Sequence, residues 1–75
     1  MAKVFTTDHV LNMFPVVAHK MVSDPAAMAF AREWASAATA LEHARKNGGA
    51  TKRLTKFALK MAEMTQQRAN ALAAE

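Results

Sequence analysis

The residues with the clearest chemical potential are six cations that fall close together in the chain. Residues 45–60 contain no acidic residue, whereas the segments before and after them each carry a net charge of −1. The excess positive charge of the protein, +4 overall, is therefore confined to one stretch. The six cations, called the basic tip below, are Arg45, Lys46, Lys52, Arg53, Lys56 and Lys60. Such a cluster can bind phosphate groups or an acidic protein surface.

The helix dipole explains only part of the basic tip. Arg45 and Lys46 come at the end of an expected helix, where the dipole favours cations. Lys52 and Arg53 come at the start of the next helix, where the dipole disfavours them, and together with exposed amides they make an anion site. Two other interpretations stay open: a solvated tip, and ion pairs with acidic groups of another subunit, such as Glu42 or Glu63. The glycines before Lys52 lack P-loop spacing.

No set of side chains suited to catalysis can be assembled from the remaining residues. The chain has no cysteine and no tyrosine, and its few acidic residues are scattered without forming a pair. His9, His19 and His43 lack metal-ligand spacing, while Ser23 and Ser36 suit a cap and a packing position. We therefore expect a protein that is not an enzyme, with no metal and no cofactor.

The composition identifies the elements that must position the basic tip. With 75 residues the chain forms at most one domain. It contains 18 alanines and no isoleucine, and 52% of its residues are hydrophobic. A chain rich in alanine and poor in β-branched residues favours helix over strand, and this hydrophobicity excludes a disordered tail. The fold class predicted is all-α, in a single helical domain over 1–75.

Periodicity predicts a first helix over about 8–22, capped by Thr7. Its apolar residues recur at helical spacing, and the pattern stays in phase through Pro15. We therefore predict one helix kinked by proline. Two short helices, the second starting at Pro15, are the alternative. The apolar stripe is Val10, Phe14, Val17 and Met21.

Two longer helices follow, over about 25–46 and 52–73. Asp24 and Pro25 mark the start of the first of these, because aspartate caps helices and proline suits the first helical position. A Gly-Gly turn over 47–50 ends it, and Thr51 can cap the next helix. Equal helices joined by a short turn predict an antiparallel helical hairpin, with the basic tip at its turn.

The large apolar residues of the hairpin are expected to pack in a core or between subunits. Small residues beside them, such as Ala31 and Ala35, let another helix approach closely. In the last helix Arg68 is the polar exception within the stripe, and a flanking row runs from Ala58 to Leu72. The packing residues predicted are Phe30, Trp34, Leu41, Leu54, Phe57, Met61 and Met64.

A domain of this size has a small core, so self-association is expected. We predict a helical-bundle homo-oligomer, with a compact three-helix monomer as the alternative. The function expected is a cytoplasmic interaction protein, of regulator or inhibitor type, that binds a macromolecular partner through its helix faces and basic tip. A protein partner is favoured. The alternatives are weakly sequence-specific binding of nucleic acid or nucleotide phosphates at the tip, and a structural assembly subunit. No membrane partner is expected.

Overall fold

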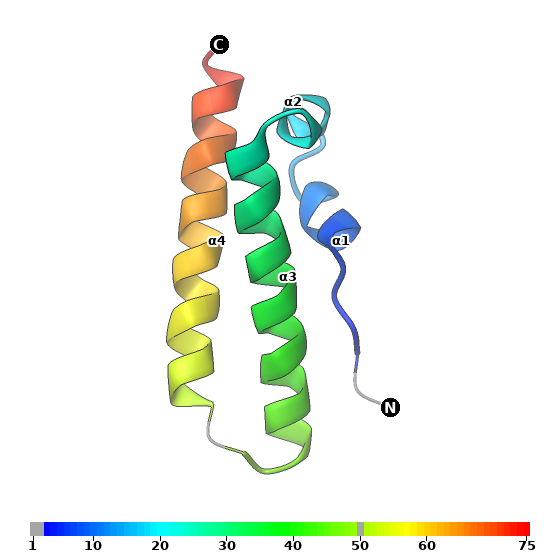
Figure 1. Ribbon diagram of the computed structural model, residues 1–75, viewed down its shortest axis with the longest axis vertical. Helices are drawn as coiled ribbons and strands as arrows, with labels where there is room; N and C mark the ends of the chain where they lie inside the picture. Colours follow the sequence, from blue (N-terminus) through cyan, green and yellow to red (C-terminus); the bar gives the residue numbers. More distant parts are fainter. Residues whose placement is uncertain (1–2, 50) are drawn as a thin grey trace.

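The protein is all-helical in a computed structural model that describes residues 3–49 and 51–75, and no strand occurs among them. Helix α1 spans Thr7–Leu11, α2 spans Ala18–Val22, α3 spans Pro25–Lys46 and α4 spans Lys52–Ala73. The two long helices lie side by side and run in opposite directions, with α1 and α2 packed against them (Figure 1). The all-α prediction is confirmed.

Helix α3 begins as the sequence predicts. One carboxylate oxygen of Asp24, Oδ1, accepts hydrogen bonds from the backbone amides of Ala26 and Ala27, at 3.0 and 3.4 Å. Pro25 occupies the first helical position, where its missing N–H leaves no bond unmade. These two residues fix the point at which the chain turns from α2 into α3.

The end of α3 is set by two glycines. Gly48 has a φ of 70°, in the left-handed region that glycine adopts without steric cost. The Gly49 amide donates to the carbonyl of Ala44 at 2.7 Å, and the Gly48 amide lies 3.5 Å from the carbonyl of Arg45. This pattern is a Schellman motif, which satisfies the last carbonyls of a helix. Residue 50 of the predicted turn lies outside the described residues.

The single kinked helix predicted over 8–22 is wrong. The chain forms the five-residue helices α1 and α2, joined by turns over 12–17, and the second begins at Ala18 rather than at Pro15. Proline has no amide to donate and disfavours helical geometry in the residue before it, Phe14. Thr6, not Thr7, is the N-cap of α1, in a reciprocal capping box with His9.

The apolar stripe of this region is nevertheless placed as its spacing predicts. Val10, Val17 and Met21 are buried and Phe14 is half-buried. Pro15 interrupts the helix, but the apolar side chains on both sides of it still face the long helices. Before α1, the extended segment lies along α3, where the Phe5 amide donates to the hydroxyl of Thr39 at 2.9 Å.

The buried face of α4 differs from the face expected to form the seam. Thr65, Ala69 and Leu72 are buried, and they belong to the row expected to flank the core. Of the row expected to form the core, Met61 is buried, whereas Phe57 is 39% exposed. The helix is therefore rotated about its axis relative to the expectation, and Arg68 of that row lies at the rim, where it pairs with Asp24.

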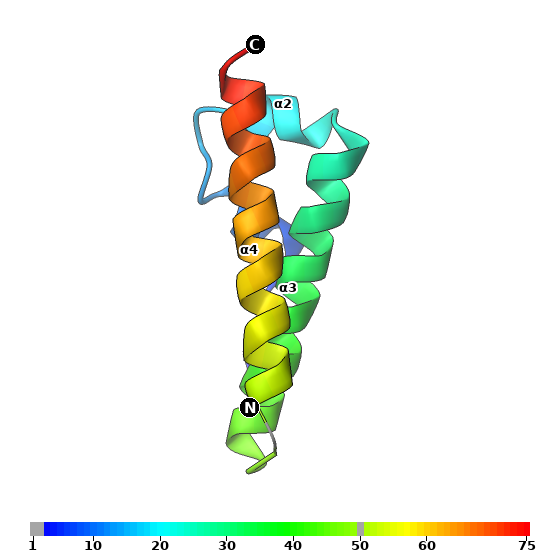
Figure 2. The ribbon, with the colours of Figure 1, turned by 90° about the vertical axis from the view of Figure 1, so that its left-hand side faces the viewer.

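The core is concentrated away from the basic tip. One cluster draws on all four helices through six buried residues, Leu11, Val17, Met21, Ala27, Ala69 and Leu72. A second cluster, formed by Val10, Ala31 and Ala35, packs α1 against α3. Beside it the rings of Phe14 and Trp34 meet edge to face, with their centroids 6.5 Å apart. Near the turn, Leu41 and Leu54 are only half-buried. Figure 2 shows α2 crossing the far end of the pair of long helices.

Candidate interaction surface

The basic tip is an exposed cluster at one end of the molecule. All six of its residues are exposed, two at the end of α3 and four in the first three turns of α4. The Schellman turn brings these two helix ends together, as Figure 1 shows at the turn between α3 and α4. Within residues 3–49 and 51–75, Arg45, Lys52, Arg53, Lys56 and Lys60 form no ion pair. Their charge is therefore available to an external anion.

The first turn of α4 has no side-chain cap. Thr51 occupies the N-cap position, but its side chain makes no capping hydrogen bond, so the predicted cap is wrong. The amides of the first turn have no partner within the helix, since such bonds start only with the amide of Thr55 to Thr51 at 2.7 Å. Lys52 and Arg53 add two exposed cations to this positive dipole end.

Two large apolar residues are exposed beside these cations. Phe57 is 39% exposed and Leu59 is 66% exposed. At 3.6 residues per turn they point to nearly opposite sides of α4. Phe57 shares its side with Lys60, whereas Leu59 lies on the side of Lys52. Of the other residues expected to pack, Phe30, Trp34, Leu41, Leu54 and Met64 are half-buried.

A shallow groove runs between α3 and α4 on the side of Met64. Its volume is about 270 Å³. The floor and walls come from one residue of α3 and four of α4, namely Phe30, Met64, Gln67, Arg68 and Ala71. Exposed Ala71 leaves the groove open where a larger residue would fill it. Phe57 lies on the same side of α4, two turns nearer the basic tip.

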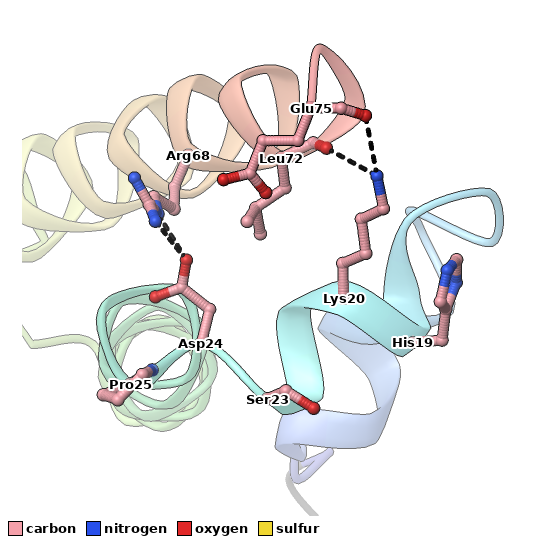
Figure 3. A pocket seen from close by; sticks show the side chains of 8 residues that line it. All are labelled: His19, Lys20, Ser23, Asp24, Pro25, Arg68, Leu72 and Glu75. Atoms are coloured by element: carbon pink, nitrogen blue, oxygen red, sulfur yellow. Dashed lines mark hydrogen bonds and ion pairs between the residues drawn. The ribbon is translucent and has the colours of Figure 1, made fainter.

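A second hollow, of about 630 Å³, lies at the opposite end of the molecule (Figure 3). At its centre Arg68 of α4 donates from Nε and Nη2 to Oδ2 of Asp24, at 2.6 and 2.5 Å. Asp24 thus caps α3 with one oxygen and ties α4 with the other. Sequence analysis missed this tie, although a lone arginine in an apolar row was its signal.

Lys20 makes a second tie across this hollow. Its ammonium donates to the backbone carbonyls of Leu72 and Glu75, at 3.1 and 3.3 Å. A cation at the end of a helix satisfies carbonyls that have no partner within it and is favoured by the helix dipole. Figure 3 shows Lys20 reaching from α2 to the end of α4. The segment between α1 and α3 is thereby fixed to both long helices.

These contacts limit the chemistry of the hollow. The Arg68 guanidinium beside Asp24 lowers the pKa of that carboxyl, and the amides of Ala26 and Ala27 lower it further. A carboxylate held in its ionised form is a weak base and a poor proton donor. Lys20 is engaged with carbonyls, and His19 is exposed. The contacts in this hollow join α2, α3 and α4, whereas the cations of the basic tip are exposed.

The lowered pKa of Asp24 predicts acid-sensitive stability. Such a group stabilises the folded protein above its unfolded pKa, about 3.9, and this contribution is lost as the pH falls through the lower folded value. We expect urea midpoints of the wild type to exceed those of Asp24→Asn at about pH 6, and the gap to shrink towards about pH 2. Asparagine keeps a capping oxygen, so the comparison isolates the charge. A gap independent of pH contradicts the prediction.

The described residues include no group of three or more histidine, aspartate or glutamate side chains placed to hold a metal ion. His9 belongs to the α1 capping box. None of the helices in the described ranges is long and apolar enough to cross a membrane. No family model, curated protein or solved structure matches the chain.

Proposed function

We propose that this is a non-enzymatic interaction protein, of regulator or inhibitor type, whose basic tip binds an acidic surface of a protein partner. The observation that carries the proposal is the exposure of six cations at one end, with five of them outside any ion pair in the described ranges. Exposed Phe57 and Leu59 add apolar area next to them. Charge that is concentrated and unneutralised accelerates association with a complementary surface and selects against others.

Charge reversal at the tip tests the proposal. We expect Lys52→Glu/Lys56→Glu to lower capture of a protein partner from a cell extract by at least about tenfold, since each lost charge pair weakens the encounter. The control, Lys3→Glu/Arg32→Glu, reverses two exposed cations elsewhere and changes the net charge equally. Helical circular dichroism checks the fold of both variants. Equal capture by the two variants contradicts a role for the tip.

A second candidate function is the binding of nucleic acid or nucleotide phosphates at the same tip. The uncapped first turn of α4, with Lys52 and Arg53, favours it, because free amides and cations together suit phosphate. Such binding depends steeply on salt. Protein purified at low salt without nuclease would then carry nucleic acid, and its high ratio of absorbance at 260 and 280 nm would fall on a salt wash. If the spectrum at low salt shows protein alone, nucleic-acid binding is contradicted and the protein partner remains the proposal.

We further propose that the α3–α4 hairpin assembles as a helical-bundle homo-oligomer. A 75-residue domain has a small core, and self-association is a common supplement to it. Exposed Phe57 and the open groove on the same side of α4 support a pairing surface there. Sedimentation equilibrium over a wide range of protein concentration tests this proposal directly.

A further inference from the structure

We propose that two copies pair antiparallel through the groove side of α4, with a two-fold axis at Met64, so that each Phe57 enters the groove of the other copy. This inference rests on the proposed self-association and adds the surface, orientation and register. Lys60 of the basic tip lies at the edge of this surface, whereas Lys52 lies on the other side of α4, so the ligand of the tip is a separate question.

The groove side of α4 presents a line of three residues. Phe57, Met64 and Ala71 recur at intervals of seven, so they fall within about 40° of one another around the helix. Phe57 is 39% exposed, Met64 is half-buried and Ala71 is exposed. The line extends for about 21 Å along α4 at 1.5 Å per residue. A seven-residue repeat of this kind is typical of a helix–helix seam.

This line of residues is complementary to itself. Phe57 and Ala71 are equally far from Met64, on either side of it. A two-fold axis at Met64 therefore places each Phe57 opposite Ala71 of the partner subunit, a large side chain against a small one. Isologous pairing requires this kind of self-complementary surface.

The groove offers space for the Phe57 side chain of a second copy. The groove of about 270 Å³ has Ala71 on its α4 side and the half-buried ring of Phe30 on its α3 side. In the proposed register, Phe57 of one copy faces this groove of the other. It can then pack against an aromatic ring, which adds to the apolar area buried. Each dimer would contain two such contacts.

Charge favours the antiparallel orientation of the two copies. A parallel pair would bring the two basic tips, with six cations each, to the same end. An antiparallel pair separates the two tips and places each of them towards the C-terminal end of α4 in the other copy, which carries Glu75. This orientation also brings Lys60 near Arg68 of the partner subunit. The positive charge of Arg68 is compensated within each subunit by its ion pair with Asp24.

The test uses the absence of cysteine from the chain. Single-cysteine variants are oxidised at low micromolar concentration and covalent dimers are measured by non-reducing electrophoresis. Met64→Cys lies on the proposed axis and should form a disulfide with itself. Phe57→Cys mixed with tagged Ala71→Cys should give mainly the mixed dimer. Leu59→Cys, exposed on the other side of α4, is the matched control and should cross-link at least about tenfold less.

A second measurement does not depend on cross-linking. Sedimentation equilibrium should show a dimer whose dissociation constant rises at least about tenfold in Phe57→Ala, as expected for an aromatic side chain that fills a groove of the other copy, and little in Leu59→Ala. Circular dichroism confirms that both variants are folded. A dimer with equal cross-linking at positions 59 and 64 overturns this surface and register but leaves self-association standing. A monomer at all concentrations overturns both proposals.

Discussion

Replacing Met21 with alanine is expected to leave the protein largely unfolded. Met21 is fully buried where α2 meets both long helices, in the cluster with Leu11, Val17 and Leu72. Removing such a side chain costs about 2–5 kcal/mol, because apolar contacts are lost and a cavity remains. A domain near this size often has only about 3–5 kcal/mol of stability in total. The expected loss is therefore comparable to the total free energy of unfolding.

Urea titration followed by circular dichroism measures this effect. The matched control is Met13→Ala, because Met13 lies in the same N-terminal region but is 54% exposed. Its urea midpoint should change little, since exposed substitutions usually stay within about 0.5 kcal/mol. Equal midpoints for the two variants would show that α2 is not part of the core.

Replacing Ala31 with leucine is the second substitution with a large expected effect. Ala31 is fully buried where α1 packs on α3, beside Val10 and Ala35. No room exists for a longer side chain unless α1 moves away. Overpacking of this kind costs about 1–3 kcal/mol. We expect lower stability together with a loosened N-terminal segment.

The single tryptophan reports this change, because Trp34 packs against Phe14 in the same cluster. Its emission should shift to longer wavelength before the helical signal is lost, as water reaches the site. The control is Ala40→Leu, the same change at an exposed position of α3. A wild-type urea midpoint and emission spectrum in Ala31→Leu would contradict the packing described for α1.

The parts of the fold that sequence analysis predicted are those set by local chemistry. The bounds of α3 follow from the Asp24 cap and from the glycines after Asn47. Each of these signals makes its hydrogen bonds with residues only a few positions away in the chain. Burial of Val10, Val17 and Met21 also follows from spacing alone. The exposure of the basic tip agrees with its high charge.

The parts that could not be predicted depend on residues far apart in the chain. Whether Pro15 kinks a helix or ends it depends on what its flanking turns pack against. The rotation of α4 goes with the pairing of Arg68 with Asp24, 44 positions away. A helix with two adjacent rows of small and apolar residues offers two similar faces, and the contacts that distinguish them come from residues distant in the sequence. Phe57 is expected to pack in the core or between subunits, and its 39% exposure excludes only a place in the core of a single copy.

The uneven distribution of the core has a consequence for local unfolding. Buried clusters and the ties made by Lys20 and Asp24 hold the two long helices together at one end, while only half-buried residues join them near the turn. Amide hydrogens near Gly48 should therefore exchange through small openings, and those around Met21 only through global unfolding. A ligand that bridges α3 and α4 at the basic tip would suppress the small openings first. Binding at one end can thus be detected as slowed exchange confined to that end.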